Sequence, residues 1–164
     1  MYIRKRIPAK DDAILIEMVL DSFRVSRGVI TSILKNAIDS LVVCNEQDVP
    51  VGFVSYRFRI MDIIYVDYVV FDEKYRGKGI ATTLLPEFEQ HIRRQGIKGI
   101  YATVDGENED ALRLFKRFGF NVAGKLGSSY IIEKFYSPQA EESSSVLKNT
   151  NAPMPQLAPN LRRK

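Results

Sequence analysis

Residues 75–85 read Tyr75-Arg76-Gly77-Lys78-Gly79-Ile80-Ala81-Thr82-Thr83-Leu84-Leu85, and this stretch follows a strand-like run at 62–71 and opens a helical pattern. Two glycines one residue apart let the backbone turn tightly and approach a ligand closely. The helix that begins there presents unpaired N–H groups and the positive end of its dipole, and both favour a phosphate. The stretch therefore predicts a cradle for a pyrophosphate. An ordinary glycine turn before a helix is the alternative.

The two commonest nucleotide-binding loops do not fit this stretch. A P-loop requires Lys and then Ser or Thr after its last glycine, but Ile80 follows Gly79. A dinucleotide loop requires a third glycine where Thr82 stands. The pattern Arg76-x-x-Gly79-x-Ala81 resembles instead the acyl-CoA-binding signature of the GNAT superfamily of N-acetyltransferases.

A second motif, Asn-Glu-Asp-Ala-Leu-Arg-Leu-Phe-Lys-Arg-Phe-Gly-Phe at 108–120, strengthens the resemblance. It is similar to the family's Asn-x-x-Ala-x-x-x-Tyr-x-x-x-Gly-Phe segment, with Phe115 in place of the usual Tyr. The order of helix, strand (98–104) and helix between the motifs is also the family's. The resemblance covers residues 2–136. It implies an α/β (α+β) fold: a mixed, mainly antiparallel sheet with helices on both faces and a splayed central strand pair.

Composition indicates one ordinary globular domain. The chain has 164 residues, of which 45% are hydrophobic and 27% charged. No apolar run approaches the ~20 residues of a membrane span, and the basic N-terminus leads to no signal core. The single Cys44 fits a reducing cytoplasm, and its strand-like surroundings favour a buried structural thiol. The single His91 has no partner for a metal site, so we expect a cytoplasmic protein without a metal.

Domain organisation follows from a change of composition at the C-terminal end. We expect a GNAT domain at 1–136, whose first helix is capped by Asp11 or Asp12, and a Pro/Ser-rich basic tail at 137–164. The tail holds half of the net charge of +4, so nucleic acid is not an expected partner. Packing of the tail on a neighbouring subunit in a homodimer is an alternative that the sequence leaves open.

The resemblance implies where acyl-CoA binds. In the family the pantetheine arm lies like an extra strand in the gap beside the central strand, here expected at 63–71, and main-chain groups hold it. One N–H there would also polarise the thioester carbonyl; a plain buried strand is the alternative. Asn108 is implied to meet the cofactor's amides, although it could also cap its helix. The residues expected to bind acyl-CoA are Val69, Val70, Phe71, Arg76, Gly77, Lys78, Gly79, Ile80, Ala81, Thr82, Asn108 and Phe115.

A general base is not obvious in the sequence. One branch of the family, which acetylates ribosomal proteins and N-termini, carries Glu where Thr103 stands. Another, which resembles histone acetyltransferases, carries Glu where Tyr65 stands. Asp67 lies two residues further on and shares a strand face with Tyr65. Asp67 is therefore the candidate base, acting through water, and a solvated or salt-bridged strand carboxylate is the alternative.

These observations predict an N-acetyltransferase that moves an acetyl group from acetyl-CoA to an amine by direct attack in a ternary complex. The acceptor is expected to be an amine-bearing small molecule or peptide. Because no strong base is apparent, an amine of low pKa, such as a peptide α-amine, is favoured. The alternative is a non-catalytic acyl-CoA-binding module of the same fold, which Thr103 and Phe115 favour.

Overall fold

The structure is a computed structural model that describes residues 1–137. Its strands are β1 (Tyr2–Lys5), β2 (Asp39–Cys44), β3 (Pro50–Ile60), β4 (Ile63–Phe71), β5 (Gly99–Asp105), β6 (Asn121–Leu126) and β7 (Ser129–Phe135). Its helices are α1 (Pro8–Ser22), α2 (Arg27–Lys35), α3 (Ile80–Arg94), α4 (Glu109–Arg117) and the short 3₁₀ turn η1 (Glu73–Tyr75). Nearly all of the expected tail, 137–164, lies outside the described residues.

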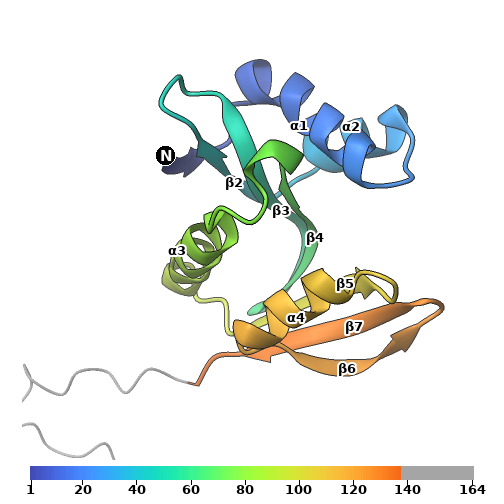
Figure 1. Cartoon of the computed structure of the whole chain (residues 1–164). Coiled ribbons are helices and arrows are strands. Elements are labelled where there is room, and N and C mark those ends of the chain that lie inside the picture. Colours follow the sequence, from blue (N-terminus) through green and yellow to red (C-terminus); the bar gives the residue numbers. More distant parts are fainter. Residues whose placement is uncertain (138–164) are drawn as a thin grey trace, which may run out of the picture.

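The strands form one sheet in the order β1-β2-β3-β4-β5-β7-β6 (Figure 1). Every neighbouring pair is antiparallel except β4 and β5, which run parallel. The parallel pair requires a crossover, which α3 supplies together with the loop before it. The mixed, mainly antiparallel sheet expected from the sequence is confirmed.

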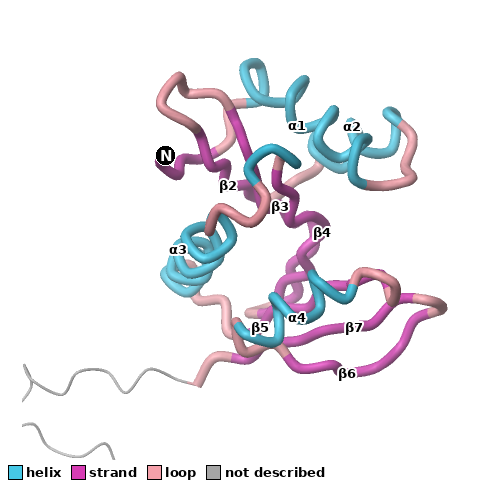
Figure 2. Tube along the Cα trace, in the orientation of Figure 1, coloured by secondary structure: helices cyan, strands magenta, loops and turns pink. Residues whose placement is uncertain are grey.

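Helices cover both faces of the sheet, as expected. One apolar core lies under α3 and α4 and includes Leu84, Phe88 and Phe115 together with Ile64 and Ile100 from the sheet. A second core lies under α1 and α2, where Leu15, Val19, Ile30 and Leu34 pack on Phe53. Figure 2 shows α1 and α2 beside the β1–β4 part of the sheet and α4 beside β5–β7. In the β5–β7 part of the sheet, the helix that covers the sheet is therefore α4.

The central strands β4 and β5 part soon after they begin. They pair only where Ile63, Ile64 and Tyr65 face the first three residues of β5, ending at Tyr101. Beyond that point β4 stays beside β3 and β5 stays beside β7. The splayed pair expected from the sequence is therefore present, and one edge of β4 has no neighbouring strand within the described chain from Val66 onward.

A bulge in β4 shifts the alternation of its side chains. The register with β3 passes from Val66 to Tyr68, which leaves Asp67 without a partner residue. Before the bulge Val66 belongs to the core under α3, whereas after it Val69 packs against that core. One inserted residue changes the period-2 pattern in this way because it adds half a pleat. After the bulge Val69 and Phe71 pack against the core under α3 and α4, and Val70 belongs to the core under α1 and α2.

The start of α1 differs from the expectation that an aspartate caps it. The helix begins at Pro8 after Ile7, and no side chain caps it. Asp11 instead accepts hydrogen bonds from the Ile7 N–H at 2.6 Å and from both terminal nitrogens of Arg4, at 2.7 and 2.8 Å. Pro at the first helical position needs no capped N–H of its own. Asp11 therefore links α1 to β1, and Asp12 pairs with Arg6.

Candidate functional site

A groove of about 800 Å³ lies between the end of β4, the glycine loop and α4. It brings together every residue expected to bind acyl-CoA except Lys78. Those lining it are Val69, Val70, Phe71, Arg76, Gly77, Gly79, Ile80, Ala81, Thr82, Asn108 and Phe115. The two motifs, far apart in the sequence, thus form opposite walls of one groove.

The glycine loop adopts the backbone that its glycines permit. Gly77 and Gly79 have φ values of +71° and +77°, in the left-handed region that favours glycine. Gly79 is the N-cap of α3, and a Cβ placed on it would meet no protein atom within 4 Å. The N–H groups of the first turn have no intrahelical partner and carry the positive end of the helix dipole. Because Gly79, Ile80, Ala81 and Thr82 all line the groove, this helix start suits a phosphate.

The two basic residues of the loop have different surroundings. Arg76 donates from Nε to the Phe71 carbonyl at 3.1 Å and from Nη2 to Ser22 Oγ at 2.8 Å. It therefore ties the loop to the ends of β4 and α1 as well as lining the groove. The Lys78 ammonium lies over the Tyr75 ring, 5.3 Å from its centre, outside the groove lining.

Helix α4 supplies the opposite wall. The Asn108 side chain caps it by accepting from the Ala111 N–H at 3.1 Å, as its position before the helix suggested. Asp110, Arg113 and Arg117 also line the groove, and Arg113 pairs with Asp110 at 2.6 Å. Sequence reasoning missed these residues, although their spacing of three and four places them on one helix face. The arginines make this wall net positive, which favours an anionic ligand.

Asp67, the candidate base, is held by one arginine. Its two oxygens accept from the Arg57 backbone N–H at 2.9 Å and from Nε and Nη2 of the same residue at 3.0 and 2.9 Å. Its side chain is 4% exposed. The ion-paired alternative is thus the arrangement that the structure shows, and Asp67 does not line the groove. A role as general base stays a prediction.

Comparison with known proteins assigns the family. The model of the acetyltransferase (GNAT) family matches residues 11–120 of the chain, a span that contains both motifs. The chain belongs to the GNAT acetyltransferase family. A solved structure of PaiA N-acetyltransferase from Thermoplasma acidophilum, in complex with coenzyme A, has the same fold. Its TM-score is 0.67 with 22% sequence identity, and the match covers 83% of this chain and all of that one.

Two GNAT relatives are named for the amines that they acetylate. The L-2,4-diaminobutyric acid acetyltransferase of Streptomyces coelicolor is 30% identical over 114 residues, which span 68% of this chain and 67% of that protein. The spermine/spermidine N(1)-acetyltransferase of Bacillus subtilis is 36% identical over 64 residues, 38% of this chain. This match and another over 64 residues each span less than half the length of the relative concerned.

Phe115 occupies the position where the GNAT motif usually has Tyr. It is 9% exposed, and its ring meets the Phe120 ring edge to face, with centres 5.3 Å apart. It also lines the groove near Val69. The aromatic packing of this position is therefore present without a hydroxyl that could protonate a leaving group.

The two positions where GNAT branches carry Glu meet each other. Tyr65 Oη lies 2.9 Å from Thr103 Oγ1, and either hydroxyl can donate. This contact joins the last paired residue of β4 to a residue of β5 that lies two positions beyond the pairing. Sequence reasoning treated the two positions separately, because only the parallel register of the strands brings them together.

Other reactive side chains lie away from the groove. Burial raises the pKa of the Cys44 thiol to about 11, so this thiol is protonated at neutral pH, as a structural cysteine would be. His91 Nε2 lies 2.5 Å from the Asp39 carboxylate. Within residues 1–137 no group of His, Cys, Asp and Glu could hold a metal ion, and no helix is long and apolar enough to cross a membrane.

Proposed function

We propose that this chain transfers an acetyl group from acetyl-CoA to the amine of an acceptor, in one step within a ternary complex. The observation that carries the proposal is the groove itself: it joins the open edge of β4 to the glycine loop at the start of α3. A ligand that places a pyrophosphate at Gly79 and an extended arm along Val69–Phe71 would fill both parts of this groove. Acyl-CoA has both parts.

The open edge of β4 suits the extended arm. Val69, Val70 and Phe71 use one edge of the strand to pair with β3. Alternate main-chain groups point to the other edge, where no strand of the described chain lies. An extended amide chain can pair with such an edge as an added strand does, and a free N–H there can also polarise the thioester carbonyl.

The transfer exchanges one bond for another at the carbonyl carbon. The neutral amine nitrogen forms a C–N bond, the C–S bond breaks, and sulfur keeps the electron pair. Nitrogen gives up one proton, and the thiolate takes up one to become CoA–SH. A cysteine-like thiol has a pKa of ~8.5, so a thiolate is a tolerable leaving group near neutral pH. The absence of a hydroxyl at Phe115 therefore slows the step without preventing it.

The acceptor is proposed to be an amine of low pKa. A lysine-type amine has a pKa of ~10.4 and an α-amine one of ~7.8, which corresponds to about 3.5 kcal/mol in the cost of the neutral form. The candidate base, Asp67, already accepts three hydrogen bonds from Arg57. The relatives named for diaminobutyric acid and spermine support an amine acceptor in general.

The test measures release of CoA thiol from acetyl-CoA across a panel of amines. Two peptides of one sequence serve as a matched pair: one has a free N-terminus and a blocked lysine, and the other a blocked N-terminus and a free lysine. At pH 7 the α-amine peptide should have the higher kcat/KM, and the difference should shrink as the pH approaches 10. Faster turnover of the lysine peptide at pH 7 would contradict the low-pKa acceptor.

A non-catalytic acyl-CoA-binding module is the second candidate. Phe115 and the Tyr65–Thr103 contact favour it, because these positions carry acids or bases in other branches of the family. Calorimetry with CoA separates the two candidates. Tight binding without thiol release on every amine of the panel would establish the binding module instead of the enzyme.

A further inference from the structure

We propose that the hydroxyls of Tyr65 and Thr103 together bind and orient the acceptor amine. The inference rests on the proposed acetyl transfer and assigns the acceptor side of that same site. The two hydroxyls lie 2.9 Å apart across the gap between β4 and β5. They are positioning groups: an amine N–H donates to this pair, and the nitrogen lone pair then points at the thioester carbon.

The pair lies where the strands begin to separate. Tyr65 faces Tyr101 in the last paired position of the parallel register. Thr103 lies two residues beyond Tyr101, where no residue of β4 pairs with β5. The Tyr65 side chain therefore reaches diagonally across the narrow end of the gap. A group bound to this pair therefore lies beside the gap between β4 and β5, next to the open edge of β4.

The pair belongs to the face of the sheet opposite the groove. Ile64 and Val66 flank Tyr65 and belong to the core under α3 and α4, as do Ala102 and Val104 on either side of Thr103. Because side chains alternate between faces, Tyr65 and Thr103 point the other way. Acyl-CoA in the groove fills the α3–α4 side, so an acceptor attacking its thioester has to enter from this other face.

The chemistry of the pair fits a neutral amine. One hydroxyl donates to the other, so the pair keeps one O–H and several lone pairs for a third group. Asp67 has a different position: Arg57 already holds both of its oxygens, and its side chain is 4% exposed. A neutral hydroxyl pair leaves the amine uncharged, whereas a free carboxylate would favour the ammonium form, which cannot attack.

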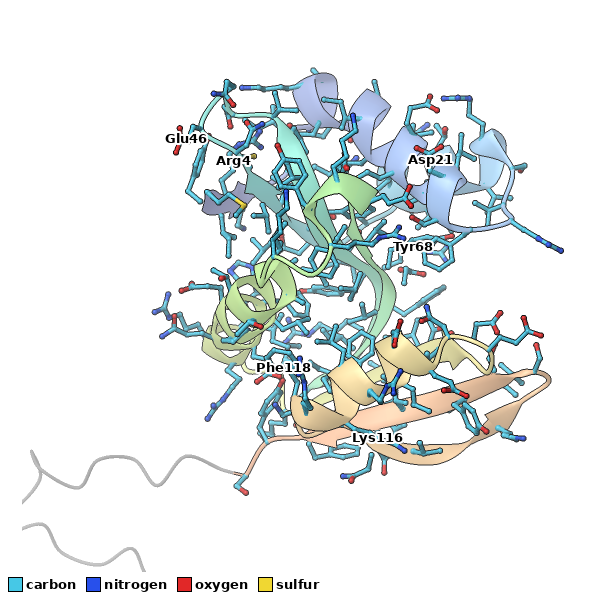
Figure 3. All side chains as sticks on the ribbon, in the orientation of Figure 1. Arg4, Asp21, Glu46, Tyr68, Lys116 and Phe118 are labelled. Atoms are coloured by element: carbon cyan, nitrogen blue, oxygen red, sulfur yellow. The ribbon has the colours of Figure 1, made fainter. Side chains whose placement is uncertain are left out.

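Neighbouring side chains hold the Tyr65 ring. The Phe58 ring meets it edge to face, with centres 6.4 Å apart, and the Arg57 guanidinium lies 4.8 Å from the Phe58 ring centre. Asp67 fixes that guanidinium through its bulge position in β4. Asp67 therefore helps to hold the Tyr65 ring in place through Arg57 and Phe58. Figure 3 shows Tyr68, the residue after Asp67, below α1 and α2. The Tyr68 ring meets the Phe23 ring edge to face.

The experiment compares isosteric variants of the full chain. Thr103→Val removes the hydroxyl and keeps the shape, whereas Thr103→Ser keeps the hydroxyl. Tyr65→Phe removes the other hydroxyl. Tyr101→Phe is the matched control, because Tyr101 faces Tyr65 in the paired part of the sheet and its ring packs on Phe135. Steady-state kinetics give kcat and the KM values for amine and acetyl-CoA for each variant.

Thr103→Val and Tyr65→Phe should each lower kcat/KM for the amine about 3- to 10-fold, the range of one lost hydrogen bond. The KM for acetyl-CoA should stay within about twofold, since neither residue lines the groove. Thr103→Ser and Tyr101→Phe should resemble the wild type. The double variant should lose less than the product of the single losses, because the hydroxyls act as one unit.

Two results would overturn the inference on an active enzyme: an unchanged kcat/KM for the amine in Thr103→Val, or an equal loss in Thr103→Ser. The second would mean that shape and not the hydroxyl matters. Failure of the proposed function gives a different result. A wild-type protein that binds CoA and acetylates no amine on the panel would overturn the acetyl transfer and this inference with it.

Discussion

Gly79 is the residue on which binding of a pyrophosphate depends most directly. Its φ of +77° disfavours any side chain, and a side chain there would enter the groove. Gly79→Leu should therefore weaken CoA binding by at least about 100-fold, or 2.7 kcal/mol, in calorimetry. Gly127→Leu is the control: Gly127 has a φ of +60° and equally open surroundings, but it lies in the β6–β7 turn. Normal CoA binding by Gly79→Leu would reject the cradle.

At Phe115 a substitution is expected to raise the rate of acetyl transfer. Its ring is fixed by Phe120 and lines the groove, so Phe115→Tyr adds a hydroxyl with little change in packing. A phenol there could protonate the departing thiolate. Such assistance contributes ~10²–10⁴-fold in enzymes, and here kcat should rise toward the lower end, because the thiolate already leaves readily. Stopped-flow thiol release in single turnover measures the chemical step. A lower rate with unchanged CoA affinity would contradict an acid at this position.

At the residue scale, the sequence predicts what depends on backbone and local spacing. The left-handed conformation of Gly77 and Gly79 follows from their place between strand and helix. The environment of Asp67 does not, because the Arg57 contacts depend on a bulge that changes the β3–β4 register. The contact of Tyr65 with Thr103 depends likewise on the register between two strands that are separated by a helix in the sequence.

Among the elements, the central strand was predicted with its observed bounds, Ile63–Phe71. This strand carries eight apolar or aromatic residues out of nine. β6 was missed, because Asn121–Leu126 is exposed along nearly its whole length and lies at the edge of the sheet. An edge strand without a buried face carries no period-2 apolar pattern, so only pairing with β7 defines it.

The link between β1 and α1 provides a stability prediction. Asp11 is fully buried and holds Arg4 with two hydrogen bonds. Asp11→Asn should lower the free energy of unfolding by about 2 kcal/mol, because it removes the carboxylate charge that accepts from both terminal nitrogens of a largely buried guanidinium, whose Nε keeps its contact with Asp48. Asp12→Asn is the control: the Asp12 carboxylate is 30% exposed whereas that of Asp11 is fully buried, so the Asp12–Arg6 pair should be worth about 1 kcal/mol or less. Urea titration followed by circular dichroism measures both.

The Asp11 contribution should also depend on pH. Burial alone would raise the pKa of Asp11, but the hydrogen bonds from Arg4 and the Ile7 N–H lower it below the ordinary value of 3.8. A group whose pKa is lower in the folded state than in the unfolded state stabilises the fold fully at any pH above its unfolded-state pKa. This contribution disappears as the pH falls through the folded-state pKa. The stability difference between wild type and Asp11→Asn should therefore be constant from pH 7 to about 5 and shrink below pH 3.8. A difference that grows on acidification would contradict this assignment.

For the molecule as a whole, the two parts of the sheet are joined by only a short stretch of strand pairing within the described residues. β4 and β5 share three paired positions, and α3 and the Lys134–Glu89 ion pair add further links between the parts. Lys134 also donates to the Phe118 carbonyl at 2.6 Å, which ties β7 to the end of α4. This arrangement keeps the gap open where a ligand is proposed to enter, while the core under α3 and α4 spans both parts.

Residues 1–137 form two apolar cores, a seven-stranded sheet and a groove lined by residues from β4, the glycine loop and α4. A chain ending at residue 137 should therefore keep its unfolding temperature within about 3 °C of the full chain, a difference of less than about 1 kcal/mol. Its affinity for CoA should also be unchanged. Thermal unfolding and calorimetry check these two expectations.

The same truncation tests what the basic tail does. If residues 138–164 held the chain to nucleic acid, the full chain would bind DNA with an affinity that falls steeply with salt, and the truncated chain would not. If they held a homodimer, light scattering would show a lower mass after truncation. Neither change is expected to alter the groove, because within residues 1–137 its lining comes from segments between Ser22 and Arg117. A truncated chain that unfolds or loses CoA would instead show that the tail completes the fold, and that the domain boundary expected after residue 136 is wrong.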